Sequence, residues 1–571
     1  MIQPDNLFTM PPSSINKSNF YFTINNTYFV AMRKIGLLPI TKLTLIVCII
    51  LFSAQMGKAQ AVLLPYSYQL DQKFNSSIYS LNNSFHTSLK PFLIDSTLTP
   101  TYNAIMQRGV DSNRKSWVSR KIFNEHLFDV KTKEYTFYGD YLPDLQVGQD
   151  VANKTNTYLN TRAYQFGGTV GTKFFFYTSG YTTLGRFPNY LNNYINKIDF
   201  VPGQAFNFNT NTPDATKDWT YVTAILSYTP IKQLNITLGE DKTFIGDGYR
   251  SLLLSDFPAN YPLLRLTASI GKVQYMFMWA YLEDQQALQF NPFGNNRRKW
   301  GAFHYLDWSI TNRLSVGYFN AIISSEADDD GNYHGFDANY IDPVFFSNAL
   351  NSNSSQPDNV FTGFTAKYKI FDKTAVYGQL LINRFNGSDF FSGSSTDNTN
   401  GVQLGIRGAD LFKVSNFNYL FEFNTVKPYT YASQQPITSY TELSEPLGDP
   451  LGANFKEVIA ILNYSIGRFD FMGQLNYAKY GLDFDATTNF GQDVTRAFNP
   501  STETASYTGQ GLSTTLKYAQ GSVSFLINPK YNLRFELGGL FRQETNAQTN
   551  SKTALITFGL RSTFRGIYSD F

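Results

Sequence analysis

The stretch "YNLRFELGGLF", Tyr531 to Phe541, alternates between two kinds of side chain. One edge is apolar and consists of Tyr531, Leu533, Phe535, Leu537, Gly539 and Phe541. The other edge carries Arg534 and Glu536, two residues apart. Successive side chains of a β-strand point to opposite faces, so this period of two predicts a strand with one apolar and one polar face. The fold then depends on which of the two faces meets water.

The same alternation recurs from about residue 135 onward, for example in "FNYLFEFNTV" and "FDFMGQLNYAKY". In a soluble sandwich the apolar set would face a core, whereas in a membrane barrel it faces lipid and the polar set lines the interior. For a barrel, the residues predicted to face lipid are Phe417, Tyr419, Phe421, Phe469, Phe471, Tyr531, Leu533, Phe535 and Leu537. The residues predicted to face the lumen are Glu422, Asp470, Arg534 and Glu536.

Connection lengths favour the barrel. Short links recur near residues 170–172, 229–232, 270–272, 310–312, 371–373, 408–413, 466–468 and 528–530. Long polar segments separate them, at residues 185–218, 324–359, 386–401, 427–453 and 483–510. Outer-membrane barrels have tight periplasmic turns and long outer loops. With one more strand at each end, these hairpins predict an all-β transmembrane barrel of about eighteen antiparallel strands, with both ends in the periplasm.

Composition limits the other classes of protein. Of the 571 residues, 16% are charged and 16% aromatic, whereas soluble domains average about 25% charged residues. The net charge of +3 is too small to indicate a nucleic-acid partner. A mean hydropathy of −0.26 excludes a bundle of apolar membrane helices. The sequence has no H-E-x-x-H pair, G-x-S-x-G turn or P-loop, so we expect no enzyme, no metal site and no cofactor.

An export signal is predicted near the start of the chain. The apolar run "LTLIVCIILFSAQ" follows Arg33, Lys34 and Lys42 and precedes small residues near Ala59, a pattern typical of a secretory signal peptide. Its apolar core is shorter than the roughly 20 residues of a spanning helix. The single cysteine, Cys48, lies within this core, so the mature chain is expected to have none.

These signals predict the organisation of the whole chain. The expected parts are residues 1–31 as an upstream extension, 32–59 as the signal peptide, 60–134 as a small, partly helical periplasmic segment, and 135–571 as the barrel. Within the periplasmic segment, "NRKSWVSRKIFNEHLFDV" has the spacing of a short amphipathic helix. We expect the outer membrane of a Gram-negative bacterium, with membrane lipid as one partner. The aromatic Phe571 resembles the signal that the outer-membrane assembly machinery reads.

The segment "GEDKTFIGDGYRSLLLSDFPANYPLLRL", Gly239 to Leu266, has features beyond those of an ordinary loop. Glycines allow close backbone approach, and charged groups alternate beside a tyrosine. Such a segment can fold into the lumen as a plug held by salt bridges, or present rings and carboxylates to a carbohydrate. We favour the plug and keep both interpretations open. The candidate residues for either role are Asp241, Lys242, Asp247, Tyr249, Arg250 and Asp256.

Four motifs together resemble a known family. They are "HTSLKP" from His86, "GDGYRSLLLSD" from Gly246, "DPLGANFKE" from Asp449 and "NPKYNLRFE" from Asn528. Their order resembles the Wzi-type capsule-assembly barrels and, more closely, the RemB-like gliding-motility proteins of Bacteroidota. The resemblance spans residues from about 65 to the end. It implies an eighteen-strand outer-membrane barrel with a small periplasmic helical part, a plugged lumen and a role at the cell surface.

Three functions remain as hypotheses. The first is a non-enzymatic surface protein in gliding motility or capsular polysaccharide attachment, whose partners are a surface glycan or adhesion proteins. The second is a porin-like channel for small solutes, because inward polar residues serve a plug and a pore alike. The third is an outer-membrane hydrolase, which the scarcity of histidine disfavours because the usual nucleophile and base partners are few.

The alternation in the opening stretch predicts opposite effects of two neighbouring substitutions. A cation on the lipid face at mid-depth costs roughly 2–4 kcal/mol. Phe535→Arg should therefore cripple barrel assembly, whereas Glu536→Gln should be tolerated. Heat-modifiable mobility on a gel measures the folded fraction, and equal mobility of the two variants would contradict the assignment.

Overall fold

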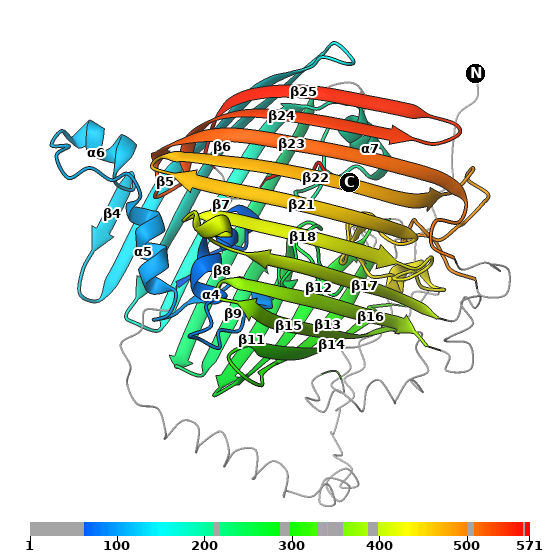
Figure 1. Cartoon of the computed structure of the whole chain (residues 1–571), viewed down its shortest axis with the longest axis horizontal. Coiled ribbons are helices and arrows are strands. Elements are labelled where there is room, and N and C mark those ends of the chain that lie inside the picture. Colours follow the sequence, from blue (N-terminus) through cyan, green and yellow to red (C-terminus); the bar gives the residue numbers. More distant parts are fainter. Residues whose placement is uncertain are drawn as a thin grey trace, which may run out of the picture. The chain divides into compact units, whose positions relative to one another are not determined.

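The wall of the molecule is one closed antiparallel sheet (Figure 1). The computed structural model describes residues 62–209, 216–285, 297–327, 333, 340, 358–385, 398–499, 507–562 and 566–571. The predicted upstream extension and signal peptide, residues 1–31 and 32–59, lie outside the described residues. Among the residues that are described, no helix combines the length and the apolar character that crossing a membrane requires.

Within the described ranges, eighteen strands form the ring, which confirms the predicted fold class. They are β5 (Tyr135–Asp150), β6 (Thr155–Val170), β7 (Phe174–Arg186), β8 (Lys217–Ile231), β9 (Leu234–Asp241), β11 (Tyr261–Ile270), β12 (Val273–Asp284), β13 (Arg297–Ser309), β14 (Leu314–Ser325), β15 (Asn359–Phe371), β16 (Thr374–Arg384), β17 (Thr399–Gly408), β18 (Phe417–Val426), β21 (Phe455–Ile466), β22 (Phe469–Leu482), β23 (Leu512–Asn528), β24 (Leu533–Thr545) and β25 (Asn550–Arg561). Each strand pairs with its neighbour in sequence, as in an up-and-down barrel.

The last strand closes the ring on the first. β25 pairs with β5 from Leu555 opposite Asp150 to Leu560 opposite Leu145. The other half of that edge of β5 is covered by a short strand, β4 (Phe128–Lys131), in register from Phe128 opposite Gly139. Because the sheet has no free edge along this seam, its backbone groups are satisfied within the wall.

Short and long connections alternate around the ring, as predicted. The links at residues 171–173, 232–233, 271–272, 310–313, 372–373, 409–416, 467–468 and 529–532 are short and share one end of the barrel. Most links at the opposite end are long; the links at residues 151–154 and 546–549 are the tight ones there. We call these two ends the short-turn end and the long-loop end.

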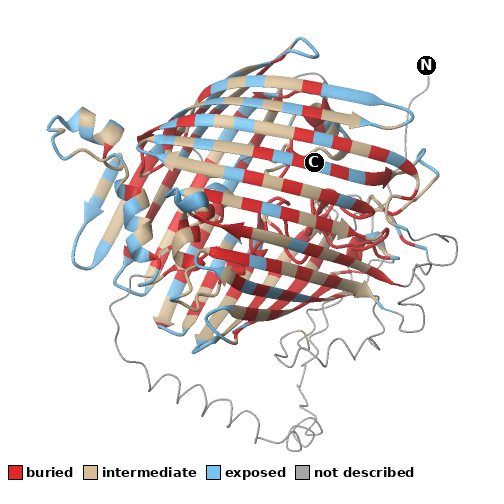
Figure 2. Ribbon diagram, in the orientation of Figure 1, coloured by how far each residue is buried: buried red, intermediate tan, exposed pale blue. Residues whose placement is uncertain are grey.

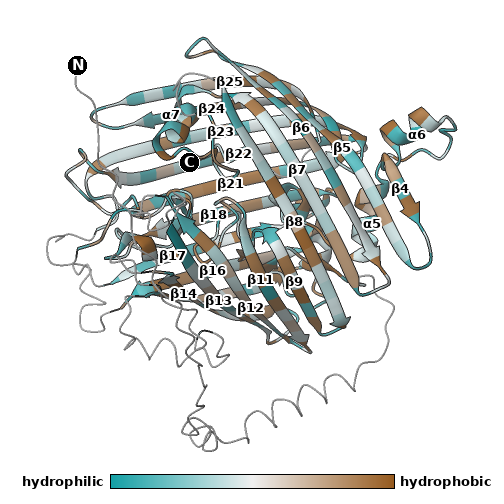
Figure 3. Ribbon diagram, turned by 180° about the vertical axis from the view of Figure 1, so that it is seen from behind, coloured by the Kyte–Doolittle hydropathy of each residue, from teal (hydrophilic) through white to brown (hydrophobic). Residues whose placement is uncertain are grey.

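Burial follows the predicted period of two along the strands (Figure 2). In β18, Asn418, Leu420, Glu422, Asn424 and Val426 are buried, whereas the residues between them are exposed or half-buried. Glu422, Asp470, Arg534 and Glu536 lie on the inner face. On the outer face, the side chains of Phe421, Phe469, Phe471, Phe535 and Leu537 are exposed and those of Phe417 and Tyr419 are half-buried. Hydrophobic and hydrophilic residues also follow one another along the wall strands in Figure 3.

Two residues depart from this pattern. Tyr531 and Leu533, predicted to face lipid, are each only 9% exposed. They pack in a cluster with Leu142 and Ile527, and Phe123 of helix α6 (Trp117–Phe123) covers this cluster. Alternation alone could not reveal this burial, because a segment distant in the sequence covers the wall at the short-turn end.

The amino-terminal segment is partly helical, as predicted, but part of it lies within the barrel instead of forming a separate periplasmic segment. Its elements are β1 (Val62–Leu63), α3 (Tyr68–Asp71), η1 (Gln72–Phe74), α4 (Asn75–Ile78), β2 (Leu89–Lys90), β3 (Leu93–Ile94) and α5 (Thr99–Gln107), followed by α6. Leu63 packs on Phe175 and Ile225 of the wall, and Tyr79 packs with Ala375. Burial against inward side chains of opposite wall strands places residues 62–94 in the lumen.

The carboxyl-terminal residues also enter the lumen. After β25 ends, Asp570 is buried and the ring of Phe571 lies 4.7 Å from that of Tyr194 and 5.5 Å from that of Phe257. Tyr194 belongs to helix α7 (Asn189–Ile198), which follows β7. Phe571 is therefore not part of a wall strand, and its recognition by the assembly machinery stays a prediction.

Candidate functional site: the charged lumen

Two segments meet at the centre of the lumen, one from each end of the barrel. The amino-terminal β2 pairs with β10 (Phe244–Ile245), which lies in the connection between β9 and β11. Lys90 Nζ donates to the carbonyl of Gly246 at 2.9 Å. Gly246 has a φ of +144°, and a Cβ there would lie 2.0 Å from the side-chain nitrogen of Gln379. A glycine is thus required where the plug meets the wall.

Asp247 joins the amino-terminal segment to the plug. Its carboxylate accepts hydrogen bonds from Tyr79 at 2.8 Å, from Ser88 at 2.7 Å and from Thr87. Burial opposes ionisation of this group. Lys367, Lys90 and the hydroxyls of Thr87 and Ser88 outweigh burial and hold the pKa of Asp247 well below its usual range. A buried carboxylate is therefore charged here and tied to both segments.

Arg407 fastens the same junction to the wall. This buried arginine of β17 donates to the carbonyl of Asp247 at 2.5 Å and to the side chain of Asn75 at 2.8 Å. Its guanidinium also lies 5.2 Å from the ring centre of Tyr79. One wall cation therefore contacts the amino-terminal segment and the central plug together.

Arg250 makes a second buried junction, between the plug, the wall and the carboxyl-terminal residues. Its guanidinium lies 3.3 Å from Glu457 of β21 and 3.1 Å from Asp570. Burial alone would lower the pKa of Arg250, but these two carboxylates raise it well above its usual value. The backbone amides of Tyr249 and Arg250 donate to Glu422 of β18, at 2.9 and 3.1 Å. The wall thus neutralises the plug cation and holds its backbone.

The remaining predicted residues lie in or beside the same plug. Asp241 is buried at the end of β9. Lys242 donates to the carbonyls of Gly203 and Asp256, at 2.6 and 3.0 Å. The Asp256 carboxylate accepts the hydroxyl of Tyr568 at 2.6 Å. The structure therefore brings the six candidate residues into the lumen, where five of them bind other parts of the protein.

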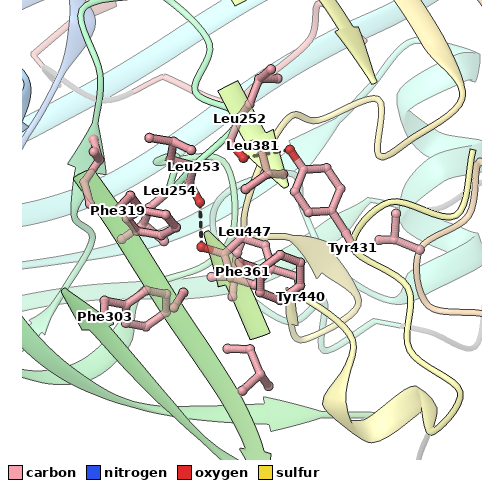
Figure 4. Close-up of a cluster of buried hydrophobic side chains, with 14 of the residues drawn as sticks. Leu252, Leu253, Leu254, Phe303, Phe319, Phe361, Leu381, Tyr431, Tyr440 and Leu447 are labelled. Atoms are coloured by element: carbon pink, nitrogen blue, oxygen red, sulfur yellow. Dashed lines mark hydrogen bonds between the residues drawn. The ribbon is translucent and has the colours of Figure 1, made fainter. Parts of the chain in front are cut away.

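Apolar packing seals the plug toward the long-loop end (Figure 4). Leu252, Leu253 and Leu254 contact wall side chains and residues of the connection between β18 and β21. Tyr431 and Tyr440 of that connection donate to the carbonyls of Leu252 and Leu253, at 2.7 and 2.5 Å. The same connection carries the short strands β19 (Thr441–Glu442) and β20 (Glu445–Pro446). The "LLL" run of the sequence is thus the apolar core of the plug.

A cavity of about 260 Å³ remains between the plug and one side of the wall. Arg534, Glu536 and Arg561 line it, together with Tyr249 and Asp570. Glu536 accepts from Arg534 at 2.8 Å and from Arg561 at 3.1 Å. At the short-turn end of the barrel, Asp470 pairs with Lys73 at 3.2 Å and with Arg108 at 2.7 Å. Asp470, Arg534 and Glu536 of the predicted lumen charges therefore form ion pairs, and those of Asp470 are with the amino-terminal segment.

Sequence reasoning missed the partners of the plug. Arg407, Glu457 and Lys367 alternate with apolar residues like any other lumen-facing side chains, so local pattern gave no sign of their role. Tyr568 and Asp570 lie beyond the last strand, where no alternation shows which side chains face the lumen. In the described part of the chain, no group of three or more His, Cys, Asp or Glu side chains is arranged to hold a metal ion. The arrangement can therefore hold the plug in the lumen by hydrogen bonds and ion pairs.

Known structures share the barrel architecture. No family model matches the sequence, and no curated protein matches it either. Wzi of Escherichia coli, an outer-membrane protein involved in group 1 capsule assembly and described as a carbohydrate-binding β-barrel, aligns over 88% of this chain and 100% of its own, with a TM-score of 0.51 and 12% identity. OprD of Pseudomonas aeruginosa aligns over 74% and 94%, with a TM-score of 0.39 and 10% identity. At this identity, the likeness to Wzi shows a common fold alone.

The Asp247 junction predicts a stability change. Hydrogen bonds to a charged group contribute about 1.5–3 kcal/mol each, so Asp247→Asn, which removes the charge that three hydroxyls bind, should lower the temperature at which the barrel unfolds in a heat-modifiability assay. Asp485→Asn, in an exposed loop, is the control and should behave like the wild type.

The lowered pKa of Asp247 predicts that the stability difference between wild type and Asp247→Asn depends on pH. Because the pKa of Asp247 is lowered on folding, its stabilisation is complete above the ordinary aspartate pKa of about 3.9 and is lost as pH falls further. The difference between wild type and Asp247→Asn should stay constant from pH 7 to about pH 5 and shrink below about pH 4. A difference that vanishes already near pH 6 would show that this carboxylate is not the charged anchor.

Proposed function

We propose that this protein is a non-enzymatic barrel of the outer membrane of a Gram-negative bacterium that acts in cell-surface assembly or adhesion. Its role would be attachment of a surface polysaccharide, gliding motility, or both. The observation that carries this proposal is the filled lumen. A transport pore needs a continuous aqueous path, whereas a surface-binding barrel needs a rigid frame for its outer connections.

Several segments fill the interior independently. Residues 62–94, the connection between β9 and β11, the connection between β18 and β21, helix α7 and residues 566–571 all contribute buried side chains. The cavity of about 260 Å³ is smaller than the roughly 300–1,000 Å³ typical of small-molecule sites. A lumen fastened by buried ion pairs on different wall strands is better suited to support outer surfaces than to pass solutes.

Aromatic rings on the long-loop end fit a carbohydrate partner. Phe208, Phe484 and Tyr507 are exposed in connections at this end. Flat aromatic faces on a polar surface suit stacking against sugar rings. The carbohydrate-binding description of Wzi, with which the fold is shared, supports a glycan partner. The motifs that resemble RemB-like proteins support a gliding role.

A channel is the second candidate function, and the cavity beside the plug favours it. The cavity extends from Gln69 of the amino-terminal segment to Arg186 at the outer end of β7. Residues 566–570 form part of its inner side. If these residues moved, a polar path along the wall would widen.

Single-molecule conductance separates the two candidates. In a planar bilayer, the purified wild-type protein should give no steady ion conductance, because the plug spans the lumen. A porin-like current from the wild type would contradict the surface-assembly proposal. The Tyr568→Phe, Asp570→Asn double variant, which loses one hydrogen bond to Asp256 and a charge beside Arg250, should raise the frequency of brief openings.

A deletion strain tests the surface role itself. Loss of spreading on agar, or loss of cell-associated capsule with free polysaccharide in the medium, is the expected result. Complementation with a Phe208→Ala, Tyr507→Ala double variant should restore a folded barrel in the membrane but neither spreading nor capsule retention. An Asp485→Asn control should restore the barrel and the lost function. Normal spreading and normal capsule in the deletion strain would overturn the proposal.

A further inference from the structure

An apolar surface outside the barrel has no partner within the described chain. On helix α6, Trp117, Val118 and Ile122 are 60%, 57% and 42% exposed. On the neighbouring strand β4, Phe128 and Val130 are exposed as well. α6 and β4 project at the short-turn end of the barrel (Figure 1). We call residues 114–133 the rim unit.

The rim unit is fixed to the wall and is not a loose end. The side-chain nitrogen of Asn528, at the turn between β23 and β24, donates to the carbonyls of Lys121 and Glu125 at 3.1 and 3.0 Å. Phe123 packs on the cluster that contains Leu533. Trp117, Val118 and Ile122 lie about 100–140° around the helix from Phe123, so they face away from this contact.

The rim unit continues the outer apolar surface of the wall. Val130 lies opposite Phe137 in the pairing of β4 with β5. The Phe137 ring stacks 6.0 Å from that of Phe166, on the outer face of β6. The half-buried rings of Phe137 and Phe166 thus lie beside the exposed Val130 of β4, without a polar break in this register.

The position of α6 along the barrel axis fits the headgroup layer of a membrane. Asn528, which holds α6, is three residues from the exposed Phe525, or about 10 Å along the strand. A strand tilt of roughly 35–45° reduces this to about 7–8 Å along the barrel axis. Each headgroup layer is roughly 5–7 Å thick beyond the hydrocarbon. If the aromatic residues near the turns mark the hydrocarbon boundary, then α6 lies within or just below the headgroups. Tryptophan prefers this depth.

The positive net charge of the rim unit favours a partner that is rich in phosphate groups. The rim unit carries six basic side chains and two acidic ones, Glu125 and Asp129. The basic residues are Arg114, Lys115, Arg120, Lys121, Lys131 and Lys133. Arg120 and Lys121 contact Glu125, and Lys131 contacts Asp129, so Arg114, Lys115 and Lys133 carry the positive charge outside these ion pairs. Basic residues beside tryptophan and aliphatic residues are the pattern of segments that lie in the plane of an anionic membrane surface.

We propose that the rim unit is a lipid-binding anchor on the periplasmic leaflet. Trp117, Val118 and Ile122 insert among the headgroups, and the basic side chains contact phospholipid phosphates. The proposal rests on the membrane placement of the barrel but not on its surface role. The anchor would fix the depth of the barrel beside its closing seam.

A depth measurement tests the anchor. In the exported chain, which is expected to have no cysteine of its own, Val118→Cys, Leu537→Cys and Ala547→Cys are each labelled with an environment-sensitive fluorophore. The proteins are placed in nanodiscs of phosphatidylethanolamine and phosphatidylglycerol, with bromine near the headgroup or near the chain end. Leu537, on the outer face of β24, is the lipid reference, and Ala547, in the tight turn at the long-loop end, is the water reference.

The expected result is a blue-shifted Val118 label that headgroup-proximal bromines quench more strongly than deep ones. Lys115→Glu with Lys133→Glu, which leaves the ion pairs of the rim unit in place, should reduce that quenching without changing the Leu537 label. A Val118 label that matches Ala547 while Leu537 is quenched would overturn the anchor alone. Protection of Val118 only after periplasmic proteins are added would also overturn it. An unquenched Leu537 label would overturn the membrane placement and the anchor with it.

Discussion

Hydrocarbon offers no hydrogen-bond partner to a peptide group, so every backbone amide of the wall must be satisfied by a neighbouring strand. The pairing of β25 with β5 is the contact that makes this possible, because it removes the last two edges of the sheet. β4 covers the part of β5 that β25 does not reach. Closure in turn gives each strand one outer and one inner face, which is why the sequence alternates with a period of two.

A closed wall creates a second constraint inside. Side chains that cannot face hydrocarbon must be solvated by water or by one another, and a filled lumen leaves little water. Arg250 and Arg407 meet this requirement with carboxylates, carbonyls and tyrosine rings contributed by separate segments. Buried ion pairs add little net stability, but an unpaired buried charge is expensive. Such pairs therefore disfavour any other position of the plug in the lumen.

The strands, the tight turns and the side of the wall on which each strand residue lies were predictable, because each depends on residues that are close in the sequence. A strand of ten or more residues shows its two faces, and a tight turn is visible within a few positions. The plug was foreseen from the charges near Asp247 and Arg250, but their partners were not. Asp247 and Tyr79 are 168 positions apart, and Arg250 and Asp570 are 320 apart. Thr87 of "HTSLKP" and Asp247 of "GDGYR" are 160 positions apart, and only the fold shows that they meet. Leu533 was misplaced for the same reason, because Phe123 covers it from a distant segment.

The central claim is that one face of each wall strand meets lipid while the other meets a packed interior. Spin labels placed singly at positions 417–425 of β18 in lipid nanodiscs test it most directly, by their accessibility to oxygen, which concentrates in hydrocarbon. The account predicts oxygen maxima at Phe417, Tyr419, Phe421, Phe423 and Thr425, and minima at the residues between them. A flat profile, or maxima at Asn418, Leu420, Glu422 and Asn424, would contradict it.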